Sequence, residues 1–128
     1  MTQTSDENKA KALRLWDQAL NKRNYAVIPE IDSPNYKFNG APQTFAEIEA
    51  FIDWINSQAP GYEFVVNYAI AEGETVALRW QINIPAGNKL PVTGGKAAHA
   101  IGANFLTFEN GLIITNDQAG GLPDVVID

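Results

Sequence analysis

The sequence contains no cysteine, only one histidine and few basic residues for its 128-residue length. Without cysteine it cannot form disulfides, thiolate metal sites or a cysteine nucleophile. The single histidine, His99, would need carboxylate partners to hold zinc, and no carboxylate cluster has a suitable spacing. No glycine-rich phosphate loop follows a predicted strand and opens a helix. We therefore expect neither a metal nor a cofactor.

The basic residues number 9 against 15 acidic ones, and they form no cluster. The resulting formal net charge of −6 is unsuited to holding a phosphate backbone, so nucleic acid is excluded as an expected partner. No apolar run approaches the roughly 20 residues of a membrane-spanning helix. The polar, acidic start of the chain also differs from a signal peptide. We expect no membrane association and a cytoplasmic location.

The first half of the chain carries apolar residues at helical spacing. Leu13, Trp16 and Leu20 fall on one helical face, behind a Thr-x-x-Glu capping box that begins at Thr4. A second capping box begins at Thr44 and precedes another apolar face. The pattern predicts three helices, over residues 4 to about 22, 26–31 and 44–59.

From residue 62 onward the spacing of apolar residues changes from helical to alternating, which is typical of strands. The pattern predicts strands over residues 36–39, 62–70, 76–84, 96–108 and 112–119. In the second of these, Tyr68 and Ile70 are predicted to share one face with Tyr62 and Phe64. Asn110 and Gly111 form a two-residue hairpin turn between the last two strands.

The order of these elements, with helices first and then a meander of strands, indicates an α+β fold. Apolar residues make up 45% of the chain and charged residues 19%, as in a single globular domain over residues 1–128. We expect a strongly curved antiparallel or mixed sheet wrapped around the three N-terminal helices. Such a domain is cone-shaped and encloses an internal pocket, a usual place for a small-molecule site.

Three segments in this order carry a resemblance to a known family. They are Leu15–Asn21 in the first predicted helix, Phe45–Phe51 in the third, and Phe105–Ile113 across the last hairpin. The chain resembles the nuclear transport factor 2-like superfamily, especially its SnoaL-like and ketosteroid-isomerase-like members. The resemblance covers residues 6 to about 120 and implies a small-molecule pocket. It also implies a homodimer through the outer face of the sheet, where Ile101 and Phe105 would be exposed.

The resemblance also indicates where catalytic groups would lie. Ketosteroid isomerases use a tyrosine, a carboxylate base and a protonated carboxyl. These places correspond to Trp16, a position near Asn39, and Asn104. Indole and amide groups donate hydrogen bonds but do not shuttle a proton at neutral pH, so steroid isomerisation is not expected. The aspartate of SnoaL-like cyclases aligns best with Gly121, which leaves Asp117 and Asp124 only as shifted candidates for that carboxylate.

His99 is the candidate catalytic residue, as a general base, because no other side chain has an ordinary pKa near neutrality. Its alternation with Ile101 and Phe105 favours the outer face of the sheet instead, opposite to Asn104. A bulge at Gly102 would reverse the two faces. Both positions of His99 therefore stay open.

Polar and small residues on the expected cavity face are the candidates for contacting a ligand. These candidate ligand-binding residues are Trp16, Asn39, Asn104, Asn116, Gln118 and Gly120. Their amides either orient a ligand carbonyl or hydroxyl, or hydrogen-bond with one another. The small residues over 94–103 either widen the pocket or allow another surface to pack closely.

The function that we predict is binding of a small, largely apolar molecule in this pocket. At most weak acid–base chemistry of the isomerase or cyclase type accompanies it. The alternatives are a non-catalytic ligand-binding module and a dimerisation domain with a vestigial cavity. Because no carboxylate base is evident in the sequence, the choice between enzyme and binding module stays open.

Overall fold

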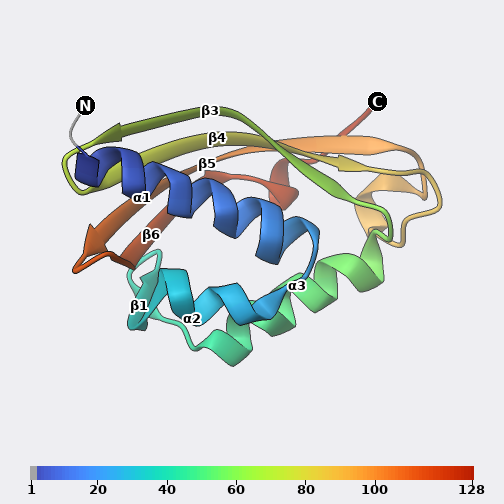
Figure 1. The fold of residues 1–128 in the computed structure, drawn as a ribbon. Helices are drawn as coiled ribbons and strands as arrows, with labels where there is room; N and C mark the ends of the chain where they lie inside the picture. The colour runs from blue at the N-terminus through green and yellow to red at the C-terminus, as the bar shows by residue number, and fades with distance from the viewer. Residues whose placement is uncertain (1–2) are drawn as a thin grey trace.

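Three α-helices lie along one face of a mixed β-sheet in the computed structural model, which describes residues 3–128 (Figure 1). The helices are α1 (Gln3–Arg14), α2 (Ile28–Ile31) and α3 (Phe45–Gln58). The strands are β1 (Asp32–Phe38), β2 (Ala41–Pro42), β3 (Glu63–Glu72), β4 (Thr75–Ile84), β5 (Ala98–Glu109), β6 (Leu112–Gly120) and β7 (Val126–Ile127). The predicted α+β class is confirmed.

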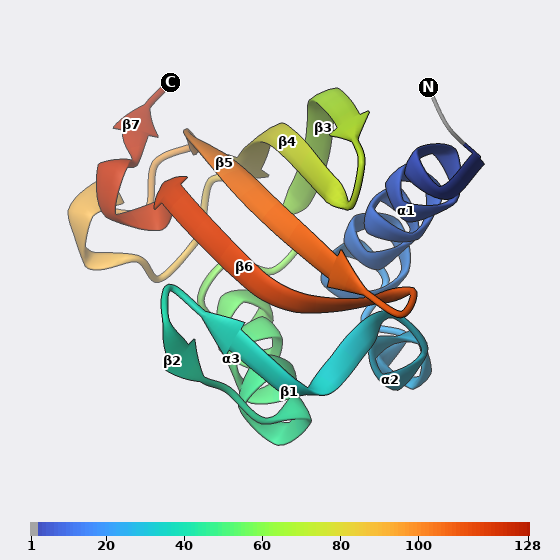
Figure 2. The same ribbon diagram turned by 90° about the vertical axis from the view of Figure 1, so that its left-hand side faces the viewer.

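The strands are ordered β2-β1-β6-β5-β4-β3, and β7 pairs with the start of β5 (Figure 2). Only β1 and β6 run parallel to each other, so the sheet is mixed. This pairing aligns Phe38 with Asn116, although the two lie far apart in the sequence. It therefore places the polar side chains of β1 beside those of β6, under the helices.

The first helix changes its geometry halfway along its length. It is α-helical to Arg14 and continues as a π-helical segment over Leu15–Asn21, whereas the sequence predicted one uniform helix to about Lys22. The capping box predicted at Thr4 is wrong, because the helix already includes Gln3 and Thr4 lies inside it. Segments of π-helix are frequent at functional sites, and this one carries the buried side chain of Trp16.

The start of α3 agrees with its predicted capping box. The Thr44 hydroxyl accepts a hydrogen bond from the Glu47 backbone amide at 3.1 Å, and the Glu47 carboxylate accepts one from the Thr44 amide at 3.0 Å. These two bonds satisfy amides that the first helical turn leaves free. The Thr44 backbone amide, and then the Thr44 hydroxyl, which also donates to the Glu47 carboxylate at 3.0 Å, lower the pKa of the Glu47 carboxyl.

The alternation predicted for β4 is confirmed, since all its even-numbered apolar side chains from Val76 to Ile84 are buried. In β3 the prediction is wrong beyond Val66. A register irregularity between Val66 and Tyr68 shifts the pairing with β4 by one residue, which turns Tyr68 and Ile70 outward. One extra residue exchanges the two faces of a strand, because its side chains alternate with a period of two.

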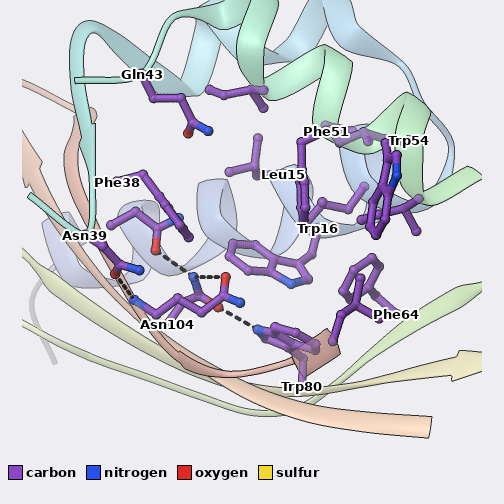
Figure 3. A pocket seen from close by; sticks show the side chains of 18 of the residues that line it. Leu15, Trp16, Phe38, Asn39, Gln43, Phe51, Trp54, Phe64, Trp80 and Asn104 are labelled. Carbon is purple, nitrogen blue, oxygen red and sulfur yellow. Dashed lines mark hydrogen bonds between the residues drawn. The ribbon is translucent and has the colours of Figure 1, made fainter. Parts of the chain in front are cut away.

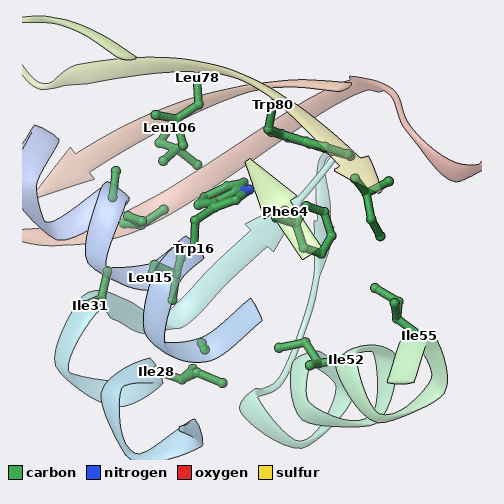
Figure 4. Close-up of a cluster of buried hydrophobic side chains, with 14 of the residues drawn as sticks. Leu15, Trp16, Ile28, Ile31, Ile52, Ile55, Phe64, Leu78, Trp80 and Leu106 are labelled. Atoms are coloured by element: carbon green, nitrogen blue, oxygen red, sulfur yellow. The ribbon is translucent and has the colours of Figure 1, made fainter. Parts of the chain in front are cut away.

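The main hydrophobic core lies between the helices and the inner face of the sheet (Figure 4). Phe64 and Trp80 meet edge to face with ring centroids 5.0 Å apart. Isoleucines 28 and 31 from α2 and 52 and 55 from α3 pack from the helical side. Among the described residues, no helix is both long enough and apolar enough to cross a bilayer.

Candidate functional site

A cavity of about 610 Å³ lies between the helices and the sheet (Figure 3). Its wall is built by the segment 15–20 of the first helix, by β1 and α3, by β3–β6, and by the turns at 90–92 and 122–123. Most of this wall is apolar side chain. The volume lies in the range of sites that enclose a drug-sized molecule.

The cavity has an apolar mouth and a buried polar floor. Phe51, Trp54 and Val92 line it and are 47%, 45% and 68% exposed, so they mark where it reaches the surface. The Phe51 and Trp54 rings stack with centroids 6.3 Å apart. Trp16 and Asp32, which also line the cavity, are only 4% and 2% exposed. A ligand that enters would therefore place its apolar part at the mouth and its polar groups at the floor.

A chain of hydrogen bonds crosses the floor (Figure 3). Trp80 Nε1 donates to Asn104 Oδ1 at 2.6 Å, and Asn104 Nδ2 donates to Asn116 Oδ1 at 2.6 Å and to Gln118 Oε1 at 3.3 Å. Asn116 Nδ2 in turn donates to the Tyr36 hydroxyl at 2.9 Å. The amides predicted to contact a ligand thus hydrogen-bond with one another. The Tyr36 hydroxyl ends the chain as an acceptor, so its own hydrogen can still be donated.

Two polar atoms of the cavity wall take no part in this series of hydrogen bonds. Trp16 Nε1 and Asp32 Oδ1 are the only buried side-chain nitrogen or oxygen atoms without a hydrogen-bond partner in residues 4–128. Burial raises the pKa of the Asp32 carboxyl from 3.8 to about 7. Burial, and then the negative charge of Asp32, raises the pKa of the Tyr36 hydroxyl above its ordinary value. Asp32 can therefore be either neutral or ionised near neutral pH.

The structure places all six predicted ligand-binding residues in the cavity wall, namely Trp16, Asn39, Asn104, Asn116, Gln118 and Gly120. Asn39 has a positive φ of 49°, and its Oδ1 accepts a hydrogen bond from the Gln118 backbone amide at 2.7 Å. Its amide therefore holds β1 against β6. That the six residues contact a ligand stays a prediction.

His99 lies elsewhere. It is on the outer face of β5, and its Nδ1 is 2.5 Å from Asp128 Oδ1. The register between β4 and β5 is uninterrupted from Thr75 to Ile84, so Gly102 forms no bulge that would turn His99 inward. The described residues contain no group of three His, Cys, Asp or Glu side chains placed to hold a metal ion.

The small residues of β5 do not widen the cavity. Ala98, Ala100 and Gly102 point inward and are buried, yet none of them lines it. A Cβ atom on Gly102 would lie 2.3 Å from Cζ2 of Trp80, so the indole ring occupies the space that this glycine leaves. The absence of a side chain at Gly102 makes room for the Trp80 ring.

The sequence interpretation missed Asp32 and Tyr36 as cavity residues. It started the first strand at residue 36, whereas β1 begins at Asp32 and pairs irregularly with β6 between Asp32 and Lys37. One signal was available in the sequence. Asp32 follows an apolar residue directly, Ile31, at the point where the short helix passes into a strand. A carboxylate at such a junction is a candidate for burial.

The cavity is enclosed by helices that cover one face of a mixed sheet, and a family comparison agrees with this arrangement. The family model described as "SnoaL-like domain" matches residues 12–116. The chain belongs to the SnoaL-like domain family. This family is part of the nuclear transport factor 2-like superfamily, so the predicted resemblance is confirmed. A comparison with curated proteins gave no match.

Solved structures show the same fold as this SnoaL-like domain. A candidate SnoaL-like polyketide cyclase from Jannaschia sp. CCS1 is 20% identical, with a TM-score of 0.78 over 96% of this chain and 91% of its own. A SnoaL-like polyketide cyclase from Agrobacterium tumefaciens is 17% identical, with a TM-score of 0.73 over 96% and 94%. A candidate ketosteroid isomerase from Kribbella flavida is 15% identical, with a TM-score of 0.69 over 91% and 79%. At these identities the likeness establishes the fold.

Proposed function

We propose that this SnoaL-like domain binds a small, largely apolar molecule in the cavity of about 610 Å³. One observation carries the proposal: the cavity is open at an apolar mouth and ends at a buried polar floor. An enclosed apolar wall with few polar groups is the usual form of a small-molecule site. The similarity to proteins named as polyketide cyclases supports a small-molecule ligand.

The candidate ligand-binding residues have two roles in this proposal. Asn104 and Asn116 form the closed part of the floor and hold the Tyr36 hydroxyl in place. Trp16 provides a free N–H at the floor, and Gly120 and Gln118 complete the wall near the end of β6. Asn39 fixes the position of the wall. His99 lies outside the cavity, and the proposal gives it no contact with the ligand.

Any chemistry in the cavity is weak acid–base chemistry of the isomerase or cyclase type. The floor contains two titratable groups, Asp32 and Tyr36, and the pKa of Asp32 is near 7. A general base works best when its pKa is close to the working pH. The alternative, a binding module without turnover, predicts the same ligand affinity and no conversion of the ligand. Product analysis after incubation with a bound compound distinguishes the two.

Binding is tested by thermal unfolding with planar apolar compounds that carry one carbonyl or phenol, including steroids, naphthols and polyketide-like compounds. A compound at 100 times its Kd should stabilise the fold by about 2.7 kcal/mol, which raises the Tm by several degrees. Ile48→Trp, which fills the cavity, should abolish the shift, and the matched Ile70→Trp on the outer face should keep it. No shift across the compounds in the wild-type domain refutes the proposal.

We also propose that a second copy covers the outer face of the sheet. The strand register places Ile70, Ala77 and Phe105 side by side across β3, β4 and β5, and both large side chains are exposed. An apolar row on a sheet face is self-complementary about a two-fold axis. Sedimentation should show a dimer that Phe105→Asp dissociates and that Val92→Asp, at the cavity mouth, does not. A wild-type monomer at all concentrations refutes this.

A further inference from the structure

Two buried atoms of the cavity floor have no hydrogen-bond partner, Trp16 Nε1 and Asp32 Oδ1. The indole N–H can only donate a hydrogen bond, and the Asp32 carboxylate, once ionised above a pH of about 7, can only accept. A buried polar group without a partner is costly, and nearly all such groups in folded proteins are satisfied. Both atoms belong to residues that line the same cavity. Their missing partners would therefore come from what occupies it.

The remaining polar groups of the floor do not supply these partners. The amides of Asn104 and Asn116 already bond to each other and to their neighbours, Trp80 and Tyr36. The protein therefore leaves the indole N–H of Trp16 and the carboxylate oxygen of Asp32 without any partner, beside the hydroxyl hydrogen of Tyr36. The two free groups are complementary in kind, so a single ligand would have to offer both an acceptor and a donor.

We infer that the cavity takes a hydroxy-carbonyl compound with an apolar frame, whose carbonyl oxygen accepts from Trp16 Nε1 and whose hydroxyl donates to Asp32. This inference rests on the proposed function and specifies its ligand. A neutral hydroxyl suits this place better than an ammonium group, because the cavity wall is mostly apolar and a buried ion pair must first desolvate both charges.

The exposure of the wall determines which way round the ligand lies. Trp16 and Asp32 are deeply buried, whereas Phe51 and Trp54 stack at the mouth. The oxygenated end of the compound therefore points inward and its apolar end lies against the two aromatic rings. A compound with an oxygen at the opposite end as well would expose that oxygen at the mouth, where water can solvate it.

The test is a calorimetric titration of the full chain with bicyclic probes, an apolar and oxygenated set and one amine. The set consists of tetralin, tetralone, tetralol and positional isomers of hydroxytetralone, because the isomers vary the spacing of the two oxygens. At least one hydroxytetralone should bind ten-fold or more tightly than both tetralone and tetralol. An aminotetralone of the same spacing, with its amine on the saturated ring so that it carries an ammonium charge, should bind more weakly than the hydroxytetralone.

Two variants assign the contacts. Trp16→Phe should remove the advantage of the carbonyl and keep that of the hydroxyl, whereas Asp32→Leu should do the reverse. Tyr68→Phe, an aromatic replacement on the outer face of the sheet and outside the cavity, should keep both. Circular dichroism and the Tm identify a variant that does not fold, and the comparison of probes in the wild-type protein stands without any variant.

Each outcome bears on a different statement. If tetralin binds as tightly as every hydroxytetralone, the cavity binds apolar compounds and the hydroxy-carbonyl inference is overturned while the proposed function stands. The inference is likewise overturned if the aminotetralone binds best. If neither these probes nor the wider compound set bind, the proposed function fails together with the inference.

Discussion

Replacing Asp32 with asparagine should change how the stability of the domain depends on pH. Asp32 is buried without a partner for Oδ1, and its pKa rises from 3.8 to about 7 on folding because of desolvation. Between these two values the folded protein keeps the Asp32 proton while the unfolded chain has lost it. The stability that this proton contributes is complete at low pH and is lost as the pH rises through about 7. The asparagine side chain of the variant has no such proton to lose.

The magnitude follows from the two pKa values. Each pH unit between them changes the free energy of unfolding by about 1.4 kcal/mol. From about pH 5 to about pH 8, the wild type should lose about 2.5 kcal/mol relative to Asp32→Asn. The asparagine amide adds buried donors that cost an amount independent of pH. The quantity to compare is therefore how the difference in free energy of unfolding between the two proteins changes with pH. The size of that difference at any single pH also contains the pH-independent cost of the asparagine amide.

Urea unfolding of both proteins at several pH values measures this difference, provided that the m values agree. All other titrating groups are common to the two proteins, so their contributions cancel. Asp32→Leu should show the same pH dependence as Asp32→Asn, since both side chains are neutral. A difference that is flat with pH, or that favours the wild type as the pH rises, contradicts the burial of an unpaired carboxyl.

Three further changes test other parts of the structure. Gly102→Ala should destabilise the fold by about 2 kcal/mol or more and alter the near-UV circular dichroism of Trp80, because the new Cβ would overlap the indole ring; unchanged spectra contradict this. Asn104→Leu should lower the free energy of unfolding by at least about 2 kcal/mol, since it removes the acceptor of Trp80 Nε1, and an unchanged urea midpoint would show that water replaces it. Thr44→Ala should cost about 1 kcal/mol through the lost capping bond, measured in urea, whereas Thr44→Ser should cost less.

Local patterns in the sequence were sufficient to predict the elements that a short motif or a single regular spacing of apolar residues describes. The capping box at Thr44 locates the start of α3, because its two hydrogen bonds join residues three apart. The alternation from Val76 to Ile84 gives the inner face of β4, because that strand pairs regularly with β5 along its whole length. Trp16 and Asn104 were placed in the cavity by family resemblance, and the structure puts both in its wall.

Other features depend on contacts between segments that lie far apart in the sequence. The irregularity after Val66 is visible only in the pairing of β3 with β4, so alternation alone put Tyr68 on the wrong face. The junction after Ile31 marks Asp32 as a candidate for burial, but the burial itself depends on contacts with distant segments such as β6, where Asp32 pairs with Ile113. The role of Gly102 likewise depends on Trp80, which lies opposite it on β4.

The position of the Trp80 ring against two glycines has a consequence for the range of ligand sizes. The indole ring lies against Gly102 and Gly121 and is held there by its bond to Asn104. Since Trp80 also lines the cavity, its ring fills space beside the two glycines that would otherwise belong to the cavity. A small residue at position 80 would add the volume of the ring to the cavity. On this side the room for a guest is therefore limited by one side chain, which can be replaced without rebuilding the backbone.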